Sequence, residues 1–546
     1  MKVLKEHINK LSYFTIFLIS IIVIIIMSSL SKYNSFWGDD IYFSIYGIYE
    51  NIFSCLVEKG YLQTHGGSYI GLFLNKFLSF GLPNLLHIHP ADFVRDYLGI
   101  IKGLITVITL LSISLISTIN NKTKKFFSLV YLFVSIYFFI CVYQSSTWVP
   151  FINYNFYRYF FSFFFLSLFL KNTYESLLSE NIKNSKKSII ITSICGFILG
   201  TSIEISFFTA ITLFFLILFY NFILKFIQKN QFRFNLGANF YIPNLFLLIA
   251  TSLFTSSSGF KEVAETRGMS ELSFNLSEFL PLYVKTCFLN EWFYWLIFII
   301  CIIFAYKISK NNNEPNQILL PIFYLISLLT VMFSLILCGK TCTMANHQNL
   351  TFFVEHINII FLYKMSLLFP ILLLLSYICC AEIKYKKIFI TCILILITCY
   401  EFICVLNKDN ISYWKDRANF FIKIQKQLYV SEKIAKFYLL RNEKPIIYHK
   451  EDTWFLCNSE IECMSGDNLD SFGAYFFKIH NLEQIKEFGY CRQENSIENF
   501  YNLGGVFTKQ ELENLKFKNL LNNEFIFENK FDDIMTVEEI YQQLEI

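Results

Sequence analysis

The chain has 546 residues, of which 55% are hydrophobic and only 16% are charged, and its formal net charge is +4. Soluble domains contain about 25% charged residues, whereas this chain contains many apolar runs close to the ~20 residues with which a helix spans a bilayer. The composition excludes a typical soluble protein and predicts an all-α polytopic membrane protein, and because the basic residues lie in loops between apolar runs, it gives no reason to expect nucleic acid as a partner.

The N-terminus contains three lysines before an apolar run from about residue 12 to 30. This run is longer than the apolar core of a signal peptide, and no A-x-A cleavage site follows it. We interpret it as an uncleaved membrane anchor whose basic end lies in the cytoplasm. Residues 31–96 are then expected on the outer face of the membrane, as the first outer loop.

The sequence Trp37-Gly38-Asp39-Asp40 comes directly after this first run. Acidic side chains are strongly disfavoured beside hydrocarbon, so two adjacent carboxylates flanked by aromatic residues indicate a site for hydroxyls, sugars or a metal ion. The alternative is that Asp39 or Asp40 caps the helix that follows. Later in the same loop, the apolar segment 69–81 is too short for a span and is predicted to form an interfacial helix or a part of the same outer loop.

Ten further apolar runs predict membrane-spanning helices and bring the expected number to eleven. They lie near residues 97–118, 126–144, 151–170, 188–203, 206–224, 239–256, 289–308, 317–338, 356–381 and 388–406. Alternation from a cytoplasmic N-terminus places all the lysine-rich connections inside, as the positive-inside rule requires. These connections are residues 122–125, 183–187, 225–233, 307–310 and 384–387. An odd number of spans places the C-terminus outside.

The polar tail after the last span is long enough for a small extracytoplasmic α/β domain. We therefore divide the chain into a membrane domain, residues 1–406, and a C-terminal domain, residues 407–546. The tail is expected to contain helices over 414–440, 508–520 and 536–545 and a strand over 445–448. It contains no nucleophile triad, P-loop or dinucleotide-binding fingerprint.

Two charged residues fall near the outer ends of predicted spans. Glu204 interrupts a long apolar stretch where two spans must turn, and it is either part of an exposed hairpin turn or a second acid that faces the aspartate pair. Arg158 is expected about two turns inside its span, where a lone arginine needs a partner. It could extend to the outer headgroups, pair with Glu204, or bind a phosphate through its planar guanidinium.

Two outer loops add further polar candidates. The loop of residues 256–268 contains Lys261 and Arg267 among small residues that would allow an anion to approach, although it is also typical of a plain polar loop. The loop of residues 339–349 contains Lys340 and His347, which are possible phosphate ligands.

Histidines in the first outer loop raise the question of a metal site. His65 lies in a polar run, and His87 and His89 form an H-x-H pair beside prolines. The sequence provides no clear third ligand, so a metal site there is the weaker interpretation.

Five short features occupy the places of recognised motifs in one superfamily of membrane enzymes. They are Trp37-Gly38-Asp39-Asp40 after the first span, the helix of residues 69–80 after a small-residue turn, Asn153-Tyr154 before a span, Glu204 at a later outer hairpin, and the Ser-Gly-Phe-Lys sequence of residues 258–261 before the outer Arg267. With these features, residues 1–406 resemble the GT-C superfamily, the polytopic glycosyltransferases that take sugars from polyprenyl-phosphate carriers. The tail is unmatched.

The resemblance implies a bacterial plasma-membrane enzyme of the cell envelope that is similar to glucosyltransferases which modify surface polysaccharide or lipid. Its donor would be a polyprenyl-phosphate-linked sugar, and its acceptor a lipid or polysaccharide on the outer face. One of Asp39 and Asp40 would be the catalytic base, and the other would orient the sugar or a divalent cation, Mg²⁺ or Mn²⁺. Glu204 would be a further catalytic acid, and a single displacement would invert the anomeric centre.

The resemblance also implies roles for the remaining polar candidates. Residues that could stabilise the departing phosphate are Arg158, Lys261, Arg267 and Lys340. Tyr154 and His347 would bind substrate. Relatives tend to have an arginine after the glycine near position 67, and in the run His65-Gly66-Gly67-Ser68 that role is either empty or passes to His65.

Other functions share parts of this pattern. A polysaccharide polymerase or ligase would have the same topology and donors, but it would favour paired arginine-rich outer loops. A transporter or flippase for lipid or sugar would favour internal repeats and spans broken by glycine or proline, which we do not detect. A membrane scaffold without catalysis is the remaining alternative.

Overall fold

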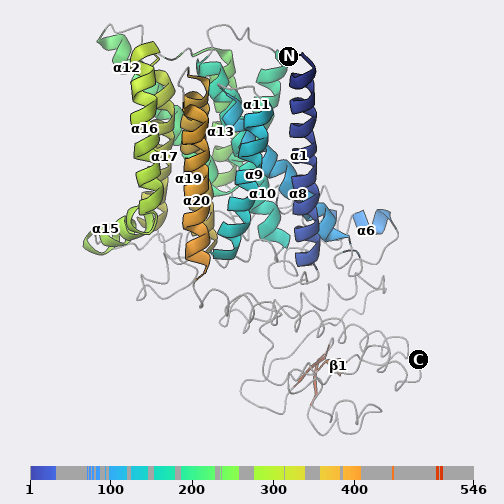
Figure 1. Cartoon of the computed structure of the whole chain (residues 1–546). Coiled ribbons are helices and arrows are strands. Elements are labelled where there is room, and N and C mark those ends of the chain that lie inside the picture. The colour runs from blue at the N-terminus through green and yellow to red at the C-terminus, as the bar shows by residue number, and fades with distance from the viewer. Residues whose placement is uncertain are drawn as a thin grey trace.

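The computed structural model describes most of the membrane domain and three short strands of the tail. The described residues are 2–31, 71, 73–74, 77–78, 82–86, 93, 97–119, 124–144, 153–178, 186–227, 234, 236–256, 276–312, 314–337, 357–381, 385–406, 446–447, 500–502 and 505–507. Within the membrane domain, the described residues are almost entirely helical, and the long helices form one bundle (Figure 1).

Each of the eleven predicted spans corresponds to one long helix among the described residues. These helices are α1 (Lys2–Ser31), α8 (Leu98–Leu115), α9 (Lys124–Gln144), α10 (Asn153–Leu178), α11 (Lys186–Gly200), α12 (Glu204–Phe226), α13 (Ala238–Thr255), α16 (Trp292–Asn312), α17 (Asn316–Leu337), α19 (Ile357–Cys380) and α20 (Lys386–Val405). In the part of the chain that the structure describes, nine of them are long and apolar enough to cross a membrane. The chain is a polytopic helical membrane protein.

The two helices outside that group of nine differ in length or polarity. Helix α11 has only 15 residues. Helix α10 has 26 residues, but polar side chains lie on both sides of its apolar stretch. It extends beyond the predicted end at residue 170, and Lys171 there pairs with Glu175 across one helical turn at 2.9 Å. Such a pair stabilises the end of a helix after the apolar run has finished.

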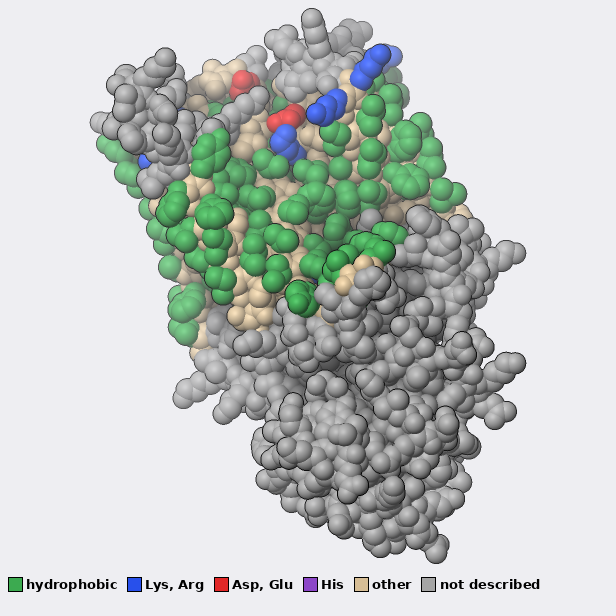
Figure 2. All heavy atoms as spheres, turned by 90° about the vertical axis from the view of Figure 1, so that its right-hand side faces the viewer, with side chains coloured by type: hydrophobic (Ala, Val, Ile, Leu, Met, Phe, Trp, Pro, Cys, Tyr) green, Lys and Arg blue, Asp and Glu red, His purple; other side chains and the backbone are tan. Residues whose placement is uncertain are grey.

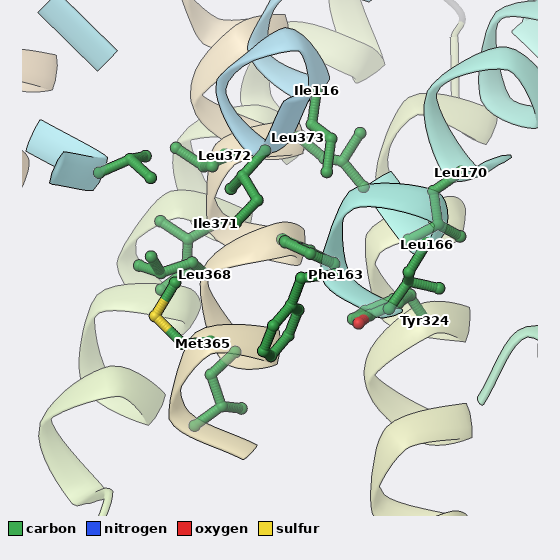
Figure 3. Close-up of a cluster of buried hydrophobic side chains, with 14 of the residues drawn as sticks. Ile116, Phe163, Leu166, Leu170, Tyr324, Met365, Leu368, Ile371, Leu372 and Leu373 are labelled. Carbon is green, nitrogen blue, oxygen red and sulfur yellow. The ribbon is translucent and has the colours of Figure 1, made fainter. Parts of the chain in front are cut away.

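Helix α19 is the centre of the bundle. Its residues 361–378 are all buried, as expected of a helix that is apolar on every side. It packs against α9, α16, α17 and α20. Figure 3 shows the core around it, where Met365, Leu368 and Ile371 of α19 lie near Phe163 of α10 and Tyr324 of α17.

Small residues allow the closest helix approaches. A Cβ placed on Gly200 of α11 would lie 2.7 Å from the backbone oxygen of Leu247 in α13, and one placed on Gly103 of α8 would lie 2.9 Å from the Cα of Ile24 in α1. Lipid tails are as apolar as leucine, so helices in a bilayer associate through such close packing and through polar contacts. On the face shown in Figure 2, hydrophobic side chains correspondingly cover most of the outside of the described helices.

Short connections give the bundle two distinct ends. We call the end with the α8–α9, α10–α11, α12–α13, α16–α17 and α19–α20 connections the lysine-rich end, because Lys125, Lys186, Lys225, Lys310 and Lys386 border it. It is the upper end in Figure 1, and charged side chains gather near it on the face shown in Figure 2. At the opposite end lie two short elements, α6 (Leu82–Leu85) and α15 (Leu276–Val284).

The described part of the tail is a small antiparallel sheet. Its strands are β1 (Ile446–Ile447), β2 (Phe500–Asn502) and β3 (Gly505–Phe507), in the order β1-β2-β3. Ile447 pairs with Tyr501, and Tyr501 pairs with Val506. The predicted strand over 445–448 contains β1, whereas the helices predicted over 414–440, 508–520 and 536–545 lie outside the described residues.

Candidate functional site

Most of the predicted site residues lie outside the described residues. These are Asp39, Asp40, His65, Lys261, Arg267, Lys340 and His347, together with His87 and His89. Tyr154 lies in the first turn of α10, where only the backbone is described. The structure describes the side chains of Arg158 and Glu204, and it brings these two together.

Arg158 and Glu204 form an ion pair at the end of the bundle opposite the lysines. Nη2 of Arg158 donates a hydrogen bond to Oε2 of Glu204 at 3.4 Å. The side chains are 19% and 6% exposed, respectively. Glu204 is the first residue of α12, where its negative charge also complements the unpaired amides of the helix N-terminus. The structure therefore shows the predicted pairing of Arg158 with Glu204, and the burial of Glu204 excludes an exposed turn there.

The backbone around this pair is tied to the α11–α12 hairpin. The Ser162 hydroxyl donates to the carbonyl oxygen of Arg158 at 2.7 Å and accepts a hydrogen bond from the N–H of Ile203 at 3.3 Å. Ile203 immediately precedes Glu204, so Ser162 fixes the position of the acid relative to the arginine. The pair is therefore held by helices α10 and α12 together.

The loop between α1 and α8 touches α10 at the same level through Gly71. A Cβ placed on Gly71 would lie 3.1 Å from the Cα of Arg158, so a larger residue there would require the backbone to move by a few tenths of an ångström. Residues 71 and 73–74 are helical, in agreement with a helix within the segment 69–81, whereas its interfacial position stays a prediction. Gly71 in this loop thus packs directly beside the buried arginine.

Lys102 is a second buried cation at this end, and the sequence analysis overlooked it. It lies in the second turn of α8 and is 1% exposed. Its Nζ lies 5.3 Å from the centroid of the Phe156 ring, two residues before Arg158, in a cation–π contact. A lysine within an apolar run was the available signal. Lys102 and Arg158 give this end of α8 and α10 the chemistry to hold an anion such as a phosphate.

A second charged cluster, also overlooked in sequence, consists of Glu291, Lys364 and Glu401. Nζ of Lys364 lies 3.6 Å from Oε1 of Glu291 and 3.7 Å from Oε2 of Glu401. The hydroxyl of Tyr294 donates to Oε1 of Glu401 at 2.5 Å. Glu291 is 2% exposed and Glu401 is fully buried. The cluster lies at the same end of the bundle as Arg158, where α16 and α19 begin and α20 ends.

The surroundings of this cluster are fixed by hydrogen bonds to backbone carbonyls. The Tyr137 hydroxyl of α9 donates to the carbonyl of Lys364 at 3.2 Å. Before α16, the chain makes a π-helical turn over Lys285–Leu289, which frees carbonyls from the regular helical pattern. The carbonyl of Cys287 in this turn accepts hydrogen bonds from the Tyr363 hydroxyl at 3.0 Å and from Nε1 of Trp295 at 2.8 Å.

Aromatic rings lie between the two charged groups. The Phe138 ring of α9 contacts the Phe160 ring of α10 at 5.3 Å and the Phe361 ring of α19 at 6.0 Å between centroids. Phe160 in turn stacks on Phe156 at 4.2 Å. The Arg158–Glu204 pair and the Glu291–Lys364–Glu401 cluster are therefore separate polar sites at one end of the bundle.

Glu291 lies in the turn just before α16, and its environment favours its protonated form. Burial raises the pKa of the Glu291 carboxyl from 4.5 to about 7, an effect that Lys364 opposes and Glu401 reinforces. A carboxyl group with a higher pKa in the folded protein binds its proton more tightly there. The contribution of Glu291 to the free energy of folding therefore becomes less favourable as the pH rises from 4.5 to about 7.

Among the described residues there is no group of three or more His, Cys, Asp or Glu side chains that could hold a metal ion. The predicted candidates for a divalent cation, Asp39 and Asp40, belong to the part of the chain that is not described.

Comparisons of the chain with protein-family models, with curated proteins and with solved structures gave no significant match. The resemblance to the GT-C superfamily therefore rests on the short sequence features and the topology alone.

Proposed function

We propose that this protein is a GT-C-type glycosyltransferase that moves a sugar from a polyprenyl-phosphate carrier to a lipid or polysaccharide acceptor on the outer face of the bacterial plasma membrane. In this proposal all eleven long helices cross the membrane, including α10 and α11. The N-terminus is cytoplasmic, and the tail forms an extracytoplasmic α/β domain. The lysines at one end of the bundle support this orientation, because basic residues favour the cytoplasmic side.

The observation that carries the proposal is the contact between the first outer loop and a buried arginine. Gly71 packs against the backbone of Arg158, and the loop that contains Gly71 also contains Asp39 and Asp40. Transfer from a phosphate-linked donor needs a base for the acceptor hydroxyl and cations for the departing phosphate. The outer loop provides the base, Asp39 or Asp40, and the adjoining ends of α8 and α10 provide the cations, Lys102 and Arg158.

The reaction is a single displacement. The acceptor oxygen attacks the anomeric carbon while one carboxylate of the Asp39 and Asp40 pair takes its proton. The bond between that carbon and the phosphate oxygen breaks, its electron pair stays on the phosphate, and the anomeric centre is inverted. Two adjacent carboxylates repel each other, which raises the proton affinity of one of them and suits it to work as a base near neutral pH.

Arg158 and Lys102 stabilise the phosphate as negative charge accumulates on it. An arginine presents a planar fork that matches phosphate oxygens, and in a partly buried site such contacts are stronger than in water. Glu204 orients the guanidinium through the 3.4 Å hydrogen bond and keeps the arginine partly neutralised before the donor arrives. Lys261, Arg267, Lys340 and the substrate-binding candidates His65, Tyr154 and His347 complete the proposed site from the outer segments.

The activity is tested with purified protein reconstituted in liposomes with an acceptor-containing membrane extract. A radiolabelled hexose on a polyprenyl-phosphate carrier is expected to be transferred to the lipid or polysaccharide fraction. The same sugar on a nucleotide serves as the control and is expected to remain untransferred. Transfer from the nucleotide sugar alone, or from none of a panel of polyprenyl-phosphate hexoses, would contradict the proposal.

The orientation is tested independently with topology reporters. A phosphatase reporter, which is active only outside the cytoplasm, is expected to be active when fused after Ile546. The same reporter fused within the lysine-rich connection of residues 183–187 is expected to be inactive, because that connection is assigned to the cytoplasm. An inactive fusion at Ile546 together with an active one at residues 183–187 would reverse the topology and move the proposed site to the wrong face.

A further inference from the structure

The Glu291–Lys364–Glu401 cluster contains two buried acids but only one buried lysine. With its side chains ionised, two carboxylates share one ammonium, and the net charge is −1. A net charge that is buried beside hydrocarbon is strongly unfavourable unless it is paired or neutralised. The cluster shares no residue with the proposed transfer site, so its role does not rest on the proposed transfer reaction.

The distances show that neither carboxylate is fully compensated by Lys364. Lys364 lies at nearly equal distances from the two acids, 3.6 Å from Glu291 and 3.7 Å from Glu401, so it is committed to neither. Oε2 of Glu291 is buried and has no hydrogen-bond partner among the described residues, and the buried Oε2 of Glu401 has no hydrogen bond there beyond its 3.7 Å ion pair with Lys364. Both residues are more than nine-tenths buried. Two unsatisfied acceptors beside a single ammonium indicate a place for one further positive charge.

Among the described residues, the other titratable groups that face the cluster do not supply this charge. They are phenols and thiols, which are ordinarily neutral at pH 7. They are Tyr137 and Cys141 of α9, Cys287 of the π-helical turn, Tyr294 of α16, Tyr363 of α19, and Tyr400 and Cys404 of α20.

We propose that Glu291, Lys364 and Glu401 form a proton-binding site that holds one exchangeable proton between the two carboxyl groups. When a hydronium ion delivers its proton to a carboxylate oxygen, water is released and the net charge of the cluster changes from −1 to zero. A proton fits this site better than a metal ion because the ammonium of Lys364 already occupies the space between the carboxylates and repels a second cation.

The position of the site allows exchange with water at one end of the bundle. Glu291 lies in the turn before α16, Glu401 is four residues before the end of α20, and Lys364 is seven residues after the start of α19. At 1.5 Å per residue, the cluster lies within about 10 Å of the end opposite the lysines. Glu291 is the member nearest to that end, and its carboxyl is the entry point for the proton.

The test is infrared difference spectroscopy of the full-length protein in lipid nanodiscs, with spectra compared just below and well above pH 7. Exposed carboxyl groups are ionised over this whole range, so they contribute little to the difference. The wild-type protein is expected to show the carbonyl band of a protonated carboxyl on the acid side. Glu291→Gln and Glu401→Gln are each expected to lose it, because the remaining carboxylate pairs with Lys364 and stays ionised.

Two further variants make the test decisive. Lys364→Met removes the ammonium that stabilises the carboxylates, so both carboxyls are expected to be protonated on the acid side and the band to increase about two-fold. Glu175→Gln is the matched control, because Glu175 is also paired with a lysine but lies near the lysine-rich end, and it is expected to leave the band unchanged. If the glutamine variants do not fold, Glu291→Asp, which keeps a carboxyl, is expected to shift the band.

Several results would overturn the proposal. They are the absence of the band in the wild-type protein, its persistence in both glutamine variants, and an unchanged band in Glu291→Asp. Loss of the band on addition of sodium or potassium at constant pH would instead identify a metal-cation site. A band that disappears in Glu175→Gln would place the proton elsewhere.

Discussion

Replacing Asp39 or Asp40 with asparagine is expected to lower sugar transfer from the polyprenyl-phosphate donor by roughly 10²–10⁴-fold, which is the usual contribution of a general base. Asparagine has nearly the same shape as aspartate but cannot accept the acceptor's proton. The amount of folded protein in the membrane is expected to stay unchanged. The variant that removes the base should show the larger loss in the maximal rate, whereas the variant that removes the orienting carboxylate should also raise the KM for the sugar donor.

A matched control is available in the same outer loop. Glu58→Gln removes one carboxylate from the loop of residues 31–96 without touching the aspartate pair, and it is expected to retain full transfer. Full activity in both aspartate variants would exclude the assignment of the base. A loss of activity accompanied by an equal loss of folded protein would instead support the alternative in which the aspartates cap a helix.

The positions of the helices could be predicted because each helix coincides with an apolar run of neighbouring residues in the sequence. An apolar run bounded by lysines is visible without knowledge of its neighbours, and the eleven runs correspond to eleven helices in the described residues. Helix α10 extends beyond the span predicted over residues 151–170 for a local reason. The Lys171–Glu175 pair continues the helix to Leu178 after the apolar run has ended, and a criterion based on hydropathy does not detect such a pair.

The charged clusters were harder to predict from the sequence because they depend on tertiary packing. Glu291, Lys364 and Glu401 each occur as a single charge at or inside a different apolar run, and 110 positions separate the first from the last. Only the packing of α16 and α20 against α19 brings them together. The Arg158–Glu204 pair was anticipated as one of several possibilities, since both residues fall near the outer ends of neighbouring predicted spans. The sequence offered no means to choose among them, and the burial of Glu204 decides the question.

Disrupting the Arg158–Glu204 pair is expected to separate its structural role from its proposed chemical role. Removing one partner of a buried ion pair leaves the other charge uncompensated and typically costs about 3–5 kcal/mol of stability. Because Glu204 is only 6% exposed, Arg158→Glu and Glu204→Arg are each expected to reduce the amount of folded protein. The double variant with both substitutions restores opposite charges between α10 and α12, so it is expected to recover much of the folded protein.

Activity is expected to follow a different pattern from folding in these variants. The double variant carries its cation on α12 instead of α10, away from the Gly71 contact and from Lys102, so we expect it to remain inactive. Arg158→Gln protein that does fold is expected to transfer sugar about 10²–10³-fold more slowly, the usual effect of removing one donor that stabilises developing charge. Arg158→Lys keeps the charge without the planar fork, and an intermediate rate is expected. Glu175→Gln, which breaks an ion pair near the lysine-rich end, should leave transfer unchanged. If the double variant were both folded and fully active, Arg158 would be a structural partner of Glu204, and the phosphate would have to be stabilised by other cations.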